Sequence, residues 1–267
     1  MQNADDITST PPSREARNFA ERMFAIHTRL VSDSDFRRFL CALASYGQIP
    51  EPQTVYPDTQ QVAEAFGFPL DAVYFFLGRA FSRYQEHKPN VAVAVRIVHV
   101  AQRATGTATP FDSGRMRHCA QGDRRYYMKL PVANESLPHR ADYVRNNRRP
   151  LCDCTDYFAA HLTRYFDRPE NYWSKPDQPI DGVHLVEPDW HDWTFELQVD
   201  APVGCSESET IYFLDQTSRE GGRSIRDEHD RLVQAGLISG VAYRPTSNPR
   251  LASETEVRRR VSETASP

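Results

Sequence analysis

Apolar residues along this chain recur with two different periods, which predict helices before about residue 90 and strands after it. In the stretch 13–30, which begins with a capping serine, the apolar residues at near-helical spacing include Phe19, Met23, Ile26 and Leu30. A second helix is predicted over 34–46, because Gly47 follows it directly. Two more helices are predicted on either side of Gly67, over 59–66 and 69–88.

From residue 91 onward, short apolar stretches alternate with Gly, Pro, Asp and Asn, which is typical of a mixed α+β domain. The strands that we expect are 91–100, 124–130, 192–199, 210–214 and 240–244. The helices that we expect among them are 155–166 and 224–235. The last residues are polar and charged, which predicts either a surface helix or a disordered tail.

The chain has 267 residues, 39% of them hydrophobic, which is enough to bury a large core. We therefore expect an α+β fold in which an amino-terminal helical annex precedes a β-rich domain. The predicted organisation is a disordered tail over 1–12, the helical annex over 13–89, the β-rich domain over 90–250 and a polar tail over 251–267.

Two of the expected strands carry polar residues inside apolar runs. In the strand 91–100, a two-residue period places Arg96 on a face of small side chains and His99 on the opposite face. In the strand 192–199, Glu196 shares a face with Thr194 and Gln198, while the other face is apolar, which predicts a half-buried strand. Either Glu196 and Arg96 are ordinary exposed charges, or the two strands form the walls of one site.

The formal net charge of −4 hides a strongly basic segment over 115–149. Its nine cationic residues are Arg115, Arg117, Arg124, Arg125, Lys129, Arg140, Arg145, Arg148 and Arg149. Only three acidic residues, Asp123, Glu135 and Asp142, lie among them. The segment is interpreted either as a contact surface for phosphates or nucleic acid, or as a solvated surface with internal ion pairs.

Several classes of protein are disfavoured because the sequence lacks their characteristic motifs. The five cysteines are irregularly spaced, and the amino terminus does not have the pattern of a signal peptide, so we expect a reducing, cytoplasmic setting. No apolar run approaches the roughly 20 residues that span a bilayer, so no membrane association is expected. Cys152 and Cys154 form an isolated pair, which disfavours a zinc site, and no metal is expected. Neither a nucleophile elbow around Ser113 nor a glycine-rich phosphate loop is present.

The two helices predicted within 58–85 have the arrangement of a helix-turn-helix. The second of them begins with Leu70, Asp71 and Ala72 and continues with aromatic residues, which suit a core or a protein interface better than the reading of DNA bases. One hypothesis is therefore an interaction or nucleic-acid-binding protein without enzymatic activity, which would use the helical annex for a protein partner and the basic segment for phosphates.

The order of polar residues after position 90 resembles the ADP-ribosyltransferase superfamily. In that superfamily a first core strand supplies an Arg or His, a second supplies a small hydroxyl or aromatic residue, and a late strand supplies a Glu. Arg96 or His99, Ser113 or Tyr126, and Glu196 in Thr194-Phe195-Glu196 stand in this order. The resemblance covers about residues 91–245.

The resemblance implies a split β-sandwich that binds NAD as a substrate in a cleft. It implies that Glu196 holds the nicotinamide ribose and stabilises the oxocarbenium-like centre that forms as nicotinamide leaves. Arg96 would contact the pyrophosphate or adenosine side, with Ser113 as the small hydroxyl residue of the catalytic set. The NAD-binding residues would be His99, Thr194, Tyr126 and Tyr127. The acceptor would be a protein or a nucleic acid, and the biological role that of a toxin or defence effector.

Overall fold

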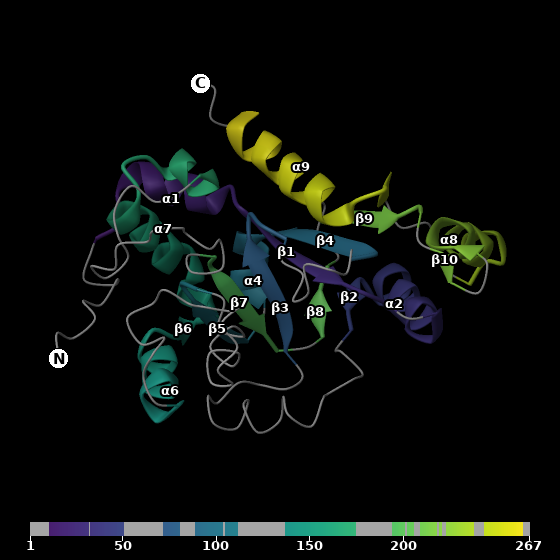
Figure 1. Ribbon diagram of the computed structural model, residues 1–267, viewed down its shortest axis with the longest axis horizontal. Helices are drawn as coiled ribbons and strands as arrows, with labels where there is room; N and C mark the ends of the chain where they lie inside the picture. Colours follow the sequence, from purple (N-terminus) through teal and green to yellow (C-terminus); the bar gives the residue numbers. More distant parts are fainter. Residues whose placement is uncertain are drawn as a thin grey trace.

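The computed structural model describes most of the chain as an α+β fold built on a large mixed sheet (Figure 1). The described residues are 11–31, 33–50, 72–80, 89–103, 105–111, 137–174, 194–200, 202–205, 209–217, 219–220, 223–237 and 243–263. The fold class expected from the sequence is therefore confirmed. The resemblance implied two sheets packed as a split sandwich. The described part of the chain instead contains one large sheet of eight strands.

The helices alternate irregularly with the strands along the chain. The helices, with two short 3-10 helices η3 and η4, are α1 (Arg14–Glu21), α2 (Asp33–Tyr46), α4 (Ile97–Arg103), α6 (Leu137–Asn146), η3 (Leu151–Asp153), α7 (Cys154–Tyr165), η4 (Pro169–Trp173), α8 (Ile225–Gln234) and α9 (Pro249–Glu263). The strands are β1 (Phe24–Arg29), β2 (Gln48–Ile49), β3 (Val73–Leu77), β4 (Val91–Arg96), β5 (Gly106–Thr109), β6 (Arg149–Pro150), β7 (Glu196–Val199), β8 (Val203–Gly204), β9 (Ile211–Asp215), β10 (Arg219–Glu220), β11 (Arg223–Ser224) and β12 (Tyr243–Thr246).

Eight of these strands form the main sheet in the order β12-β9-β4-β1-β3-β7-β5-β6. Every neighbouring pair in it is antiparallel except β12 and β9, which are parallel. The strands that lie at its centre are remote in sequence, so the sheet is held by long-range pairing rather than by consecutive hairpins. Two short ribbons, β2 with β8 and β10 with β11, lie outside it.

The expected helical annex is wrong in two places, because β1 and β3 lie at the centre of the main sheet. The near-helical spacing of Phe19, Met23 and Ile26 spans a helix, a turn and a strand, since α1 ends at Glu21 and β1 begins at Phe24. The stretch Val73–Leu77, expected within a helix, is rich in aromatic and β-branched residues and forms β3. The helix-turn-helix interpretation fails with it, and the first helix of that pair lies outside the described residues.

The two strands singled out from the sequence are also shorter than expected. The strand over 91–100 ends at Arg96, and the next seven residues form α4, so His99 lies on a helix. The strand over 192–199 begins at Glu196. All four of its residues are buried, so the expected half-buried strand is wrong. Both faces of the strand are therefore covered by other parts of the chain.

The two faces of the main sheet are covered by different helices. Residues that pair directly across neighbouring strands point to the same side of a sheet. We call the side that carries Glu196 the Glu196 face, and the other side the Phe195 face. On the Phe195 face the rings of Tyr157, Phe158 and His161 in α7 pack against Phe195.

The carboxyl-terminal helix α9 covers part of the Glu196 face (Figure 1). The register pairs Phe24 with Arg96 on that face, and Arg260 of α9 stacks over the ring of Phe24. Residues 249–263, most of the expected polar tail, therefore form a helix that packs on the sheet. Its buried residues are Pro249, Ser253, Glu256, Val257 and Val261.

Several predicted elements are confirmed with small shifts at their ends. The helix predicted over 34–46 is α2, and Gly47 follows it with a φ of 59°. The helices predicted over 155–166 and 224–235 are α7 and α8. The strand predicted over 210–214 is β9, and the one over 240–244 corresponds to β12. The strand predicted over 124–130 lies outside the described residues.

Gly78 ends β3 at a position that has no room for a side chain. Its φ is +67°, and an added Cβ would lie 2.7 Å from the Trp173 ring and 2.9 Å from the Met23 sulfur. The backbone N–H of Gly78 donates to the Phe24 carbonyl at 2.8 Å. The glycine therefore lets β3, β1 and η4 approach closely.

We expect Gly78→Ala to lower the free energy of unfolding by about 3 kcal/mol, because it combines backbone strain with a forced clash. The control is Gly236→Ala, since Gly236 has the same φ of +67° but open space around its Cβ. That control should cost only about 1 kcal/mol, the cost of the backbone conformation alone. Urea unfolding of both variants measures the difference, and equal losses would contradict the packing explanation.

His161 is a titratable group inside the aromatic core of the Phe195 face. It is 1% exposed, and its ring contacts those of Phe158, Tyr165 and Phe195. Neither ring nitrogen has a hydrogen-bond partner among the described residues. Burial lowers the pKa of His161 to about 3, and the charges of Arg164 and Arg79 act in the same direction. The imidazole is therefore neutral in the folded protein.

We expect the free energy of unfolding to fall as the pH is lowered from about 6.5, because the unfolded chain then binds a proton that folded His161 excludes. His27, whose pKa burial lowers to about 4, acts in the same sense. Between pH 7.5 and pH 5 the contribution of His161 is about 2 kcal/mol.

Denaturant unfolding of wild type and His161→Leu at both pH values tests this expectation. The variant should lose about 2 kcal/mol less than wild type over that interval. Parallel losses in the two proteins would mean that His161 is not buried in its neutral form.

Candidate functional site

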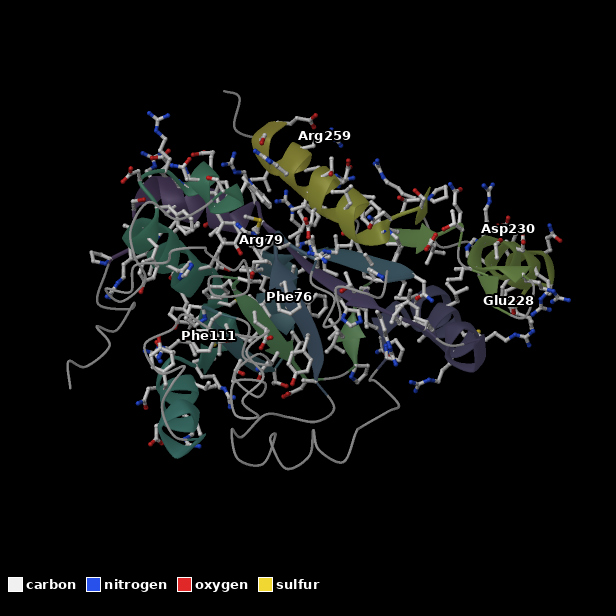
Figure 2. All side chains as sticks on the ribbon, viewed as in Figure 1. Phe76, Arg79, Phe111, Glu228, Asp230 and Arg259 are labelled. Atoms are coloured by element: carbon white, nitrogen blue, oxygen red, sulfur yellow. The ribbon has the colours of Figure 1, made fainter. Side chains whose placement is uncertain are left out.

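A patch of polar and aromatic side chains lies on the Glu196 face, across strands β3, β7 and β5. The register pairs Glu196 with Phe76 on one side and Thr109 on the other. One step along the strands, Gln198 pairs with Tyr74 and Thr107. We call these six residues the polar patch: Tyr74, Phe76, Thr107, Thr109, Glu196 and Gln198. Figure 2 shows Phe76 at the middle of the sheet.

The charged member of the polar patch is deeply buried. Glu196 is 1% exposed, and the amide of Gln198 donates to its Oε1 atom at 2.8 Å. The hydroxyl of Thr107 donates in turn to Oε1 of Gln198, at 3.4 Å. This chain of bonds orients the Gln198 amide with its NH₂ group toward the carboxylate. Because a buried carboxylate is costly without partners, the polar residues around Glu196 are part of what makes its position tolerable.

Arg148 supplies the positive charge that faces the polar patch. It lies between α6 and β6, and its side chain is half-buried. Burial lowers the pKa of Arg148, while the acidic groups of Glu196 and Tyr74 act against that effect. Arg145 lowers the pKa further by charge repulsion. The polar patch therefore combines a carboxylate, a phenol, two hydroxyls and an amide on one side of the sheet, and Arg148 adds a guanidinium beside it.

This combination of groups can bind a ligand that carries hydroxyls and a planar ring. Threonine and glutamine side chains exchange hydrogen bonds with hydroxyls, and the half-buried rings of Tyr74 and Phe76 offer surfaces for stacking. A fixed carboxylate in a site of low polarity can stabilise positive charge that develops on a bound ligand. The same carboxylate can accept a proton from a hydroxyl or a water.

Arg96, predicted to act beside Glu196, lies elsewhere on the same face. It forms an ion pair with Glu209 and stacks over the ring of Phe24 at 4.9 Å. The strands β3 and β1 lie between β7 and β4, which separates Arg96 from Glu196 by roughly 15 Å. The expectation that these two residues share one site is therefore wrong.

The remaining predicted NAD-binding residues are not gathered around Glu196 in the described structure. His99 lies on α4, which packs against α1, α7 and η3 on the Phe195 side of the sheet. Thr194 is buried and stands two residues before Glu196, at the entrance to β7. Ser113, Tyr126 and Tyr127 lie outside the described residues.

The described part of the basic segment includes Arg140, on the backbone of α6, and three further arginines that each have a partner within the chain. Arg145 pairs with Asp142, and Arg148 faces Glu196. Arg149 donates to the carbonyls of Asn146 and Arg148 and stacks over Tyr157 at 5.5 Å. The other predicted phosphate contacts, Arg115, Arg117, Arg124 and Arg125, lie outside the described residues.

Sequence reasoning missed most of the polar patch around Glu196. Tyr74 and Phe76 were hidden because their segment was predicted as a helix. Arg148 was recognised only as a member of the basic segment. The one signal available was the alternation of Thr194, Glu196 and Gln198, which correctly placed Glu196 and Gln198 on one face.

Neither a metal cluster nor a membrane-spanning helix appears in the described ranges. No three side chains of His, Cys, Asp or Glu gather there in a way that could hold a metal ion. Of the helices described, none has both the length and the apolar character needed to cross a bilayer.

The chain was compared with known proteins in three ways. A scan against models of protein families, a search of curated proteins and a search of solved structures found no match for this chain.

Proposed function

We propose that this chain cleaves the glycosidic bond of NAD, as an ADP-ribosyltransferase or an NAD glycohydrolase, with Glu196 as the catalytic carboxylate. The observation that carries the proposal is the burial of Glu196 within the polar patch, opposite Phe76 and facing Arg148. The choice of NAD as substrate rests on the order of residues that resembles the ADP-ribosyltransferases, in which the late-strand glutamate is this same residue.

The reaction breaks the bond between C1′ of the ribose and the ring nitrogen of nicotinamide. The bonding electron pair moves to the nicotinamide nitrogen, which cancels its positive charge. The ribose is left with oxocarbenium character, which the negative charge of Glu196 would stabilise. Water or an acceptor nucleophile then adds to C1′ and gives up a proton, for which the carboxylate is a suitable base.

The neighbours of Glu196 fit the other parts of such a substrate. Phe76, directly opposite Glu196 in the register, and Tyr74 present half-buried rings that would stack on a planar ring system. Thr107 and Gln198 would hydrogen-bond to ribose hydroxyls. Arg96 has no part in this site, and its ion pair with Glu209 is assigned a structural role. The acceptor would be a protein, a nucleic acid or water.

We expect Glu196→Gln to reduce nicotinamide release from NAD by about a hundredfold or more, because it removes the charge and keeps the shape. The measurement is nicotinamide release by purified wild type and variant, with water alone and with protein, RNA or DNA as acceptor. NAD binding is followed in parallel by calorimetry. The two proteins should bind NAD with similar affinity if the charge acts mainly on the transition state.

The matched control is Glu209→Gln, which makes the same chemical change at the Arg96 ion pair. It should leave nicotinamide release within about twofold of wild type, because a partly exposed ion pair contributes little. The absence of NAD binding and of nicotinamide release in wild type would reject the proposed function. Equal losses of activity in the two variants would reject the assignment of Glu196.

A further inference from the structure

The backbone register brings Arg148 to the row of the sheet that contains Glu196. Strand β6 pairs with β5 so that Pro150 lies opposite Thr107 and Arg149 opposite Ala108. Continued by one residue, the same register places Arg148 beside Thr109, whose other neighbour in the row is Glu196. Arg148 and Glu196 are thus two strand spacings apart, roughly 10 Å between backbones, on one face. A long arginine side chain can bridge most of such a gap.

The two arginines nearest to Arg148 in the sequence lie in different surroundings from it. Its neighbour Arg149 points to the opposite face of the sheet, because successive residues of a strand alternate between faces. There Arg149 stacks over Tyr157, which packs against Phe195. Arg145, one helical turn earlier, is exposed and pairs with Asp142. The charge of Arg148 interacts with that of Glu196, which raises the pKa of Arg148 against the effect of burial.

We infer that Arg148 is a positioning residue, which holds the buried carboxylate of Glu196 in its ionised form and aligned with the polar patch. The physical reason is that a carboxylate removed from water loses its hydration and keeps its charge only where an opposite charge and hydrogen bonds replace it. In this site Arg148 supplies the charge, and the Gln198 amide supplies a hydrogen bond. The inference concerns the charge pair itself, and only its effect on catalysis rests on the proposed function.

Other groups on the same face also lie near Glu196 and influence the ionisation of its carboxyl group. Tyr74 on β3 interacts with Arg148 in the same sense as Glu196. Phe76 on β3 and Thr109 on β5 are uncharged at any pH, as is Gln198 on β7. Among the groups named here, Arg148 is the cation, so its removal should change the ionisation of the carboxylate more than the removal of any other of them.

The test compares Arg148→Met and Arg148→Lys with the control Arg145→Met, which removes an exposed arginine from the same segment. The ionisation of Glu196 is followed by carboxyl carbon NMR of protein labelled at glutamate, with Glu196→Gln used to assign the signal. In Arg148→Met the midpoint of the Glu196 titration should move upward by about one pH unit or more. Arg148→Lys should return it most of the way, and Arg145→Met should leave it close to wild type.

Nicotinamide release as a function of pH is the second readout. Arg148→Met should lower release severalfold or more at pH values below the shifted Glu196 midpoint, with recovery as the pH rises above that midpoint, because the carboxylate is then ionised without help. A shifted Glu196 midpoint in a protein that releases no nicotinamide would support the charge pair and reject the proposed function. Release that depends on Glu196, together with an unchanged midpoint, would support the function and overturn the inference.

A stability cycle keeps the inference testable if Arg148→Met folds poorly. Removing one member of a buried pair leaves the other uncompensated, whereas removing both relieves it. Arg148→Met should therefore destabilise wild type more than it destabilises Glu196→Gln, as measured by urea unfolding. Equal losses in the two backgrounds would overturn the inference.

Discussion

The burial of one carboxylate in the middle of a sheet is the constraint on which the proposed site depends. Glu196 belongs to a strand that is buried on both sides, so its charge has lost contact with water. Such a position is tolerable only when neighbouring strands place hydrogen-bond donors and an opposite charge on the same side. The register of β5, β7 and β3 supplies the hydroxyls, the amide and the aromatic rings, and the segment before β6 supplies the arginine.

The rest of the fold holds that register in place. β1 pairs with β3 on one side and with β4 along its full length on the other, so it links the half of the sheet under α9 to the half with the polar patch. At the end of β3, Glu254 of α9 accepts a hydrogen bond from the backbone of Ala80 at 2.8 Å. Arg79, whose pKa burial lowers, stacks over Tyr172 and donates to its carbonyl (Figure 2). Both helical layers are therefore tied to the strand that carries Phe76.

The sequence predicted the elements whose local signals agree with their place in the fold. α8 has a serine cap with a reciprocal Asp227 bond, and α2 ends at a glycine with positive φ, so both were placed within one residue or so at each end. The segments around β1, β3 and α4 were misassigned because short apolar runs fit a helix or a strand equally well. Their conformation is decided by partners far along the chain, and a one-dimensional pattern does not contain those partners.

The candidate site shows the same division. The polar alternation in Glu196–Val199 identified the strand and the face that Glu196 shares with Gln198, but the burial of that face depends on other parts of the chain. Arg96 looked like the natural partner because it ends an apolar strand, yet three strand spacings separate the two residues. Arg148 looked like one of many surface arginines, and only the pairing of β6 with β5 brings it near Glu196.

The arginines of this chain interact with carboxylates in two kinds of environment. Near the surface, Arg231 and Arg37 hold the pKa of Glu228 at about 2, and Arg259 and Arg260 do the same for Glu256. The arginines of those ion pairs are partly or fully exposed, so water screens the pairs even though Glu256 itself is buried. Arg148 instead meets its carboxylate where water is displaced, and there a single charge has the largest effect on a neighbouring group. Within the basic segment 115–149, Arg148 is thus the arginine that we propose to act on a charge inside the protein.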